Sequence, residues 1–95
     1  MRRKKSPNID FMMGYVKDYL DGQMERWAFD LDFDHHIITR YEKMERENSE
    51  YAEAFGYYIS DCGVDCGDKL SDTDHKKLIQ KQYDQLIDLV TDGFI

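Results

Sequence analysis

The chain has one proline and two cysteines in 95 residues, and it has no long apolar run. A membrane-spanning helix needs about 18 or more consecutive apolar residues, and a secretory signal needs an apolar core that charged residues interrupt here. We therefore expect a cytoplasmic protein that does not enter a membrane. In that compartment both cysteines are expected to be reduced thiols. The sequence also lacks Pro-rich linkers, low-complexity segments and internal repeats, which favours a single domain.

Motifs of enzymatic chemistry are missing as well. There is no Gly-rich phosphate loop and no Gly-x-Ser-x-Gly sequence, and Ser49 and Ser71 fit helix caps better than nucleophiles. A chain this short has little volume for a cleft that excludes water. The three histidines could each pair with a carboxylate, but every acidic protein offers such pairs. We expect a non-enzymatic protein with no catalytic residue and no cofactor.

Positive charge is scarce outside the N-terminus. Of the 13 Lys and Arg, four occupy residues 2–5, so residues 6–95 hold 9 against 20 Asp and Glu, a net charge of −11 beside −7 for the whole chain. A body this acidic repels nucleic-acid phosphate, and we expect it to bind no nucleic acid directly. It suits a basic protein partner. The alternative is that the charge serves solubility alone.

Apolar residues recur at helical spacing over most of the sequence. This pattern predicts an all-α fold, a compact bundle of four main helices over about residues 9–21, 35–47, 50–61 and 72–92, and it allows a short helix near 23–29. Whether residues 35–61 form one bent helix or two is open. Residues 1–7 are predicted to be a disordered basic tail before a single helical domain over 8–95. The expected core is Met12, Val16, Leu20, Trp27, Ile38, Tyr41, Phe55, Tyr58, Ile79, Tyr83, Leu86 and Val90.

Capping residues mark the expected helix ends. Asn8 is a good N-cap for the first helix, and Asp21-Gly22 is a typical helix end, after which we favour a break. Ser49 followed by Glu50 predicts a new start. The Ser71-Asp72-Thr73-Asp74 sequence is close to a capping box, with Asp in place of Glu or Gln. Gly63 and Gly67 are expected to end the third main helix.

Apolar and acidic residues alternate strictly from Phe29 to Asp34. Such alternation is the usual signal of a strand, but Asp is a poor strand former and no second strand offers a partner. We therefore expect an extended connection. It would place Phe29, Leu31 and Phe33 inward and leave the carboxylates in water.

The same stretch is the best candidate for a metal site. Acidic residues at alternate positions begin an EF-hand loop, but His35 stands where that loop needs Gly, and Tyr41 where it needs Glu. No metal site is favoured. The alternative function is a metal-binding protein that uses Asp30, Asp32, Asp34, His35 and His36. Cys62 and Cys66, with His75 further on, have a spacing that only weakly resembles a zinc site.

The remaining candidate is a surface that binds another protein. Aromatic side chains ringed by charge are typical of interface hot spots, and Tyr57 lies off the apolar stripe of its helix. The predicted binding surface consists of Asp30, Asp32, Asp34, Glu47, Glu50, Glu53 and Tyr57. The sequence thus favours a protein-binding or inhibitory module, such as an immunity-type protein that covers the basic face of a nuclease. A homodimer is also open.

Overall fold

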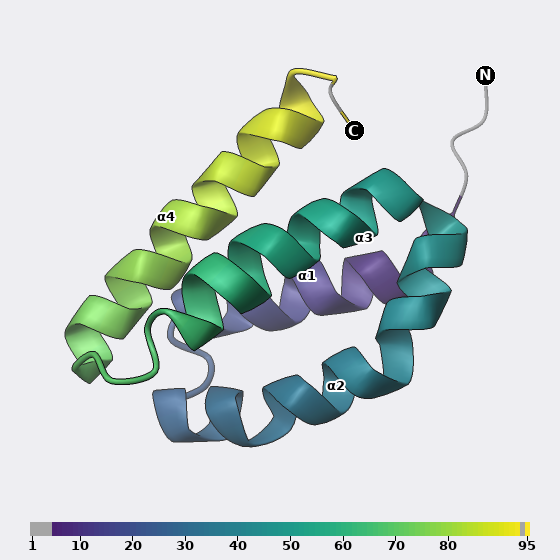
Figure 1. Cartoon of the computed structure of the whole chain (residues 1–95). Helices are drawn as coiled ribbons and strands as arrows, with labels where there is room; N and C mark the ends of the chain where they lie inside the picture. The colour runs from purple at the N-terminus through teal and green to yellow at the C-terminus, as the bar shows by residue number, and fades with distance from the viewer. Residues whose placement is uncertain (1–4, 94) are drawn as a thin grey trace. The chain divides into compact units, whose positions relative to one another are not determined.

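The computed structural model describes residues 5–93 and 95 (Figure 1). Its helices are α1 (Pro7–Leu20), α2 (Arg26–Glu47), α3 (Ser49–Phe55), a π-helix η1 (Gly56–Asp65) that continues α3, and α4 (Asp72–Thr91). No strand occurs in these residues, so the all-α fold class is confirmed. None of the described helices combines the length and the apolar character that crossing a membrane requires.

The chain divides into two units by its internal contacts. One is Met1–Ala52, which contains α1, α2 and the first turn of α3, and the other is Glu53–Ile95, which contains η1 and α4. A single domain over residues 8–95 stays a prediction. Most of the predicted tail, residues 1–4, lies outside the described residues, and Pro7 already belongs to α1.

Helices α1 and α2 pack against each other in the first unit and run in opposite directions (Figure 1). Phe29 of α2 is fully buried, and its ring stacks on Tyr15 and Tyr19 of α1 with centroid distances of 5.3 and 4.4 Å. The Tyr15 hydroxyl donates a hydrogen bond of 2.7 Å to the carbonyl oxygen of Phe29. Phe33, one turn later, lies 5.4 Å from the Phe29 ring. Aromatic stacking therefore joins the two helices.

The first turn of α1 is capped by a residue of another helix. Asn8 was expected to be the N-cap, but the helix begins at Pro7, and Ser6 in the N-cap position makes no side-chain cap hydrogen bond. Pro7 has no N–H, so Asn8 and Ile9 carry the open donors of this turn. Both donate to the Glu47 carboxylate, at 3.0 and 2.9 Å. A residue at the end of α2 thus replaces the local cap.

The predicted break at Gly22 is confirmed. Gly22 has a φ of +84°, which residues with side chains rarely adopt, and α1 ends just before it. The expected extended connection over residues 29–34 is wrong, however. One continuous helix, α2, replaces it together with the short helix near 23–29 and the separate helix over 35–47. Phe29 and Phe33 are four residues apart, so helical geometry buries both on the side of α1.

Helical geometry also changes the expected core. Leu31, which a strand would place beside Phe29 and Phe33, points the other way and is 70% exposed. Trp27 and Ile38, both expected in the core, are 67% and 80% exposed, so these two assignments are wrong. Of the other expected core residues, Met12, Val16, Phe55, Ile79 and Leu86 are buried, and Leu20, Tyr41, Tyr58, Tyr83 and Val90 are half-buried.

Residues 35–61 contain two helices, because Asn48 interrupts them. Its backbone is extended (φ −164°, ψ 101°), and α2 ends at Glu47. The Asn48 side chain accepts a hydrogen bond of 3.1 Å from the backbone N–H of Tyr51. Asn48 is thus the N-cap of α3, one residue before the expected Ser49.

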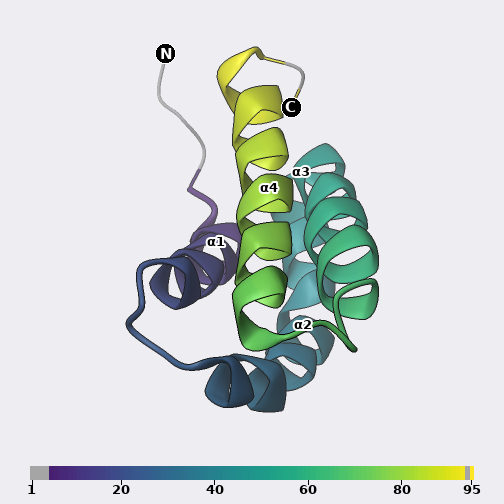
Figure 2. The ribbon, with the colours of Figure 1, turned by 90° about the vertical axis from the view of Figure 1, so that its left-hand side faces the viewer.

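The second unit is built on the contact between η1 and α4, which lie side by side (Figure 2). Gly63, expected to end its helix, instead lies inside η1, which runs past the expected end at residue 61 to Asp65. A Cβ atom at Gly63 would lie 2.9 Å from Cδ1 of Ile79, so the missing side chain allows the two helices to approach. Ser71 caps α4 as expected, because its Oγ accepts from the N–H of Asp74 at 3.2 Å.

Replacing Phe33 and Leu31 separately tests whether this stretch is helical. Phe33→Ala should lower the free energy of unfolding by about 3 kcal/mol because it empties a buried site. Leu31→Ala should change it by less than about 0.5 kcal/mol because that side chain already faces solvent. Urea denaturation of both variants measures the difference. An equal loss of unfolding free energy in both variants would favour the extended connection and contradict helix α2.

Candidate protein-binding surface

Helix α2 presents three large apolar side chains to solvent. Trp27, Leu31 and Ile38 are 67%, 70% and 80% exposed. With 3.6 residues per turn, the three positions fall within about 40° of one another around the helix. Phe29 and Phe33 point to the opposite side and are buried. The exposed residues therefore form one stripe, directly opposite the face that packs on α1.

Two of the three aspartates of the predicted binding surface, Asp30 and Asp34, border this stripe, and Asp32 lies further round the helix. Asp30, Asp32 and Asp34 are all exposed. By helical geometry Asp34 lies about 20° from Trp27, almost in line with the stripe, and Asp30 lies about 60° from Trp27 on the same side. Asp32 lies on the other side, about 100° beyond Leu31. Asp30 also pairs with the side chain of Arg26 at 3.3 Å, one turn before it. We call Trp27, Leu31 and Ile38 together with Asp30, Asp32 and Asp34 the outer face of α2.

The aspartates of this face affect the pKa of Tyr15, which lies in the contact between α1 and α2. Burial raises the pKa of the Tyr15 hydroxyl to about 12, and the negative charges of Asp32 and Asp30 contribute. The neutral hydroxyl is therefore favoured, and it is the form that donates to the carbonyl of Phe29.

Glu47, also expected at the binding surface, is half-buried. It accepts hydrogen bonds from the backbone N–H groups of Asn8 and Ile9, and from the Asn8 side chain at 2.7 Å. The Asn8 side-chain oxygen accepts in turn from Arg40 at 3.0 Å, and the Arg40 guanidinium lies 3.7 Å above the centre of the Phe11 ring. Glu47 thus has a structural role, and its part in binding stays a prediction.

Glu50, Glu53 and Tyr57 complete the predicted surface, and all three are exposed. Glu50 belongs to the first unit, whereas Glu53 and Tyr57 belong to the second. The Tyr57 ring packs edge-on against Tyr58, with centroids 5.0 Å apart. Hydrogen bonding with Cys62 is the largest cause of a raised pKa at the Tyr57 hydroxyl. Tyr57 is therefore an exposed aromatic side chain that stays neutral at physiological pH.

The structure does not bring the alternative metal ligands together. Asp30 and Asp34 are one turn apart on the same side of α2, but Asp32 points about 160° away from each of them. His35 is exposed, and His36 is half-buried on the side of α1. Across residues 5–93 and 95, no three His, Cys, Asp or Glu side chains are grouped as metal ligands would be.

His36 takes part in packing instead. Its ring lies edge-on to Phe11 and Tyr15 of α1, with centroid distances of 5.0 and 4.9 Å. Burial and the neighbouring Arg40 cation hold the pKa of His36 below its usual value. The neutral imidazole that results is suited to contact with aromatic rings.

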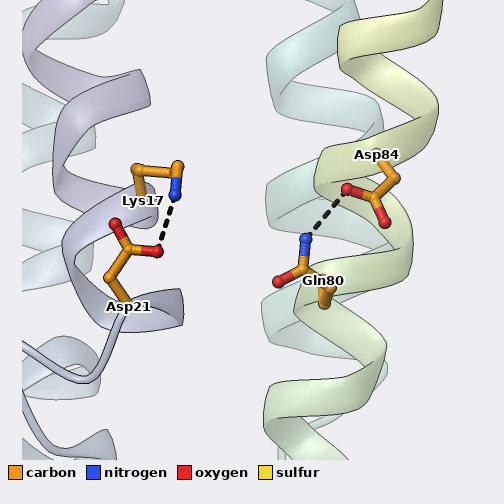
Figure 3. A network of polar contacts seen from close by, with 4 residues as sticks. All are labelled: Lys17, Asp21, Gln80 and Asp84. Carbon is orange, nitrogen blue, oxygen red and sulfur yellow. Dashed lines mark hydrogen bonds and ion pairs between the residues drawn. The ribbon is translucent and has the colours of Figure 1, made fainter.

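Polar pairs on exposed helix surfaces are local. Lys17 contacts Asp21 at 2.6 Å at the end of α1, and Gln80 donates to Asp84 at 2.8 Å on α4 (Figure 3). Each pair joins residues four apart, with Asp21 as the C-cap of α1 and both Gln80 and Asp84 inside α4. Such exposed contacts contribute well under 1 kcal/mol as a rule, roughly 0.3–0.5 kcal/mol for a helical ion pair. Asp84 is therefore suitable as a control position for charge changes.

Sequence reasoning missed the apolar part of the outer face, because it assigned Trp27 and Ile38 to the core. The spacing of Phe29, Phe33 and Met44 fits one side of a continuous helix, but the alternation over residues 29–34 fits a strand equally well. All three are buried on one side of α2. Reading residues 26–47 as one helix would have placed Trp27 and Ile38 on the opposite side.

Removing the Glu47 carboxylate should destabilise the first unit. We expect Glu47→Ala to lower the free energy of unfolding by about 2 kcal/mol, because two N–H groups of α1 lose a charged acceptor. Glu45→Ala is the matched control: it removes an exposed carboxylate of the same helix and should cost less than about 0.5 kcal/mol. Thermal or urea unfolding compares the two. A Glu47 variant as stable as the Glu45 variant would refute the distant cap.

Tyr15→Phe should change how stability depends on pH. Because the folded-state pKa of about 12 exceeds the unfolded value of 10.0, Tyr15 contributes stability below pH 10 that is lost as the pH rises toward 12. The variant should be less stable by about 1 kcal/mol at neutral pH. Between pH 10 and 12 it should lose less stability than the unmodified chain. Denaturation at several pH values measures both effects, and parallel pH profiles would contradict them.

Comparisons with known proteins supply no relative. No protein-family model and no curated protein match the sequence, and no solved structure matches the fold. A functional assignment therefore depends on the residues and contacts of the chain itself.

Proposed function

We propose that this chain is a cytoplasmic, non-enzymatic module that binds or inhibits a basic protein. The observation that carries the proposal is the outer face of α2, where three exposed apolar side chains stand among three exposed aspartates. Trp27 and Leu31 are one turn apart and Ile38 lies two turns further on the same side, and large apolar side chains gathered on one exposed side often mark an interaction site.

The composition of this face fits a protein interface. Trp is enriched among the residues that contribute most to binding, and it is typically surrounded by residues that exclude water. Trp27 supplies such an anchor, with Leu31 one turn further along the helix. Its indole N–H donates to the Glu25 carboxylate at 2.7 Å, so the polar edge of the ring is already satisfied. The apolar surface of the ring is what a partner would cover.

Electrostatics supports a basic partner. Residues 6–95 carry a net charge of −11, which attracts a cationic surface over long distances and accelerates encounter. A protein that normally binds nucleic acid has such a surface. In the concrete form of the proposal, the chain is an immunity-type inhibitor whose carboxylates occupy the place of phosphates. Exposed Glu50 of the same unit would add a further carboxylate, and Glu53 and Tyr57 of the second unit are separate candidates for binding.

Neutralising the aspartates of the outer face tests the proposal. The variant Asp30→Asn/Asp32→Asn/Asp34→Asn should bind a basic partner at least about tenfold more weakly at low salt, because three charge attractions are lost. The matched control is Asp84→Asn/Asp88→Asn/Asp92→Asn, which removes the same charge from exposed positions at α4. The measurement is the amount of partner that the immobilised chain retains at low and at high ionic strength. Equal losses in both variants, or retention that salt does not weaken, would contradict the proposal.

A further inference from the structure

The exposed stripe on α2 is straight. Trp27 and Ile38 are eleven residues apart in one helix, so at 1.5 Å per residue the stripe extends about 17 Å along the helix axis. Leu31 lies between them, and all three side chains are more than half exposed. Positions 27, 31, 34 and 38 alternate in spacing between four and three residues, as do the positions along which two helices pack in a coiled coil, with Asp34 as the polar member of the row. The shape therefore favours a helical partner element.

The carboxylates around the stripe indicate that the partner helix is basic. Asp30 borders the stripe on one side, exposed Asp32 lies further round the helix on the other side, and Asp34 lies between Leu31 and Ile38. Among these, Asp30 has a cation of its own helix nearby, the side chain of Arg26. A facing helix with Lys or Arg on both sides of its apolar stripe would bring a cation to each flank.

Charge also opposes a second copy of the chain as the occupant. Two outer faces brought together would place two identical sets of three carboxylates in one interface. Like charges at helical contacts are destabilising. In each copy Arg26 pairs with Asp30, and one such cation does not balance three carboxylates.

We propose that the outer face of α2 receives a basic amphipathic helix of the partner protein, with its apolar stripe on Trp27, Leu31 and Ile38 and its Lys or Arg side chains against Asp30, Asp32 and Asp34. The inference rests on the proposed function and names the partner element. It is helix-in-groove recognition, in which the apolar residues anchor the helix and the flanking charges orient it.

The full chain carries a built-in reporter for this contact. Trp27 is its only tryptophan, and it lies on the stripe. The probe is a synthetic, Trp-free peptide of Leu, Ala and Lys, with Leu at helical spacing and Lys on both flanks. Its control has the same composition in an order that breaks the stripe. The striped peptide should shift Trp27 emission to shorter wavelength and bind at least about tenfold more tightly than the control peptide.

Two variants distinguish the contribution of the apolar stripe to peptide binding from that of the overall negative charge. Leu31→Gln/Ile38→Gln should reduce affinity for the striped peptide about tenfold, to the level of the control peptide, because the apolar contact is lost. Leu70→Gln, which changes an exposed leucine between η1 and α4, should bind as the unmodified chain does. Far-ultraviolet circular dichroism confirms that each variant is helical. A Trp27 shift that survives Leu31→Gln/Ile38→Gln would overturn the proposal.

Two further outcomes would also overturn it. Equal, salt-sensitive binding of both peptides would mean that the overall acidic charge attracts cations and that the helical stripe has no part in binding. The proposed function would not be contradicted by that result, but the basic amphipathic helix as its partner element would be. A concentration-dependent Trp27 shift in the chain alone, with a doubled mass in sedimentation, would show that a second copy covers the stripe. The proposed function fails by a different result, when neutralising the three aspartates leaves partner binding unchanged.

Discussion

The Glu47 carboxylate accepts hydrogen bonds from the backbone N–H groups of Asn8 and Ile9 and from the Asn8 side chain. A negative charge at a helix N-terminus also interacts favourably with the helix dipole. Because Glu47 is the last residue of α2 and Asn8 the second residue of α1, this contact holds the end of one helix at the start of the other. It fixes the antiparallel alignment on which the first unit depends.

That alignment decides what each side of α2 does. Once Glu47 is held at α1, the same side of the helix brings Phe29 onto Tyr15 and Tyr19. The residues on the opposite side, Trp27 and Ile38 among them, are then left to solvent. The stabilising contact and the proposed binding surface are therefore two consequences of one helix orientation. A change in the rotation of α2 would bury the stripe and lose the aromatic stack together.

The second unit depends on the close packing of η1 against α4, whereas the first depends on a charged contact. A Cβ atom at Gly63 would lie 2.9 Å from Cδ1 of Ile79, so a larger residue at this position would require the Ile79 side chain to shift or the two helices to move apart. A π-helix as long as η1 is uncommon, since such turns are normally single and often occur at functional positions. Exposed Tyr57 and its partner Cys62 both lie on η1. Glu53 and Tyr57, the two residues of the predicted binding surface that belong to this unit, remain candidates for binding.

The sequence by itself determined the helical class, the break at Gly22 and the Ser71 cap, because each depends on local spacing or local backbone chemistry. It also supplied the acidic charge and the exposed aspartates of α2. Tertiary structure alone decided the cap at Glu47, because a contact between residues 39 positions apart leaves no local pattern. It also decided which apolar residues are exposed: alternation along residues 29–34 fits a strand equally well, and only packing against α1 selects the helix that buries Phe33 and leaves Leu31 in solvent.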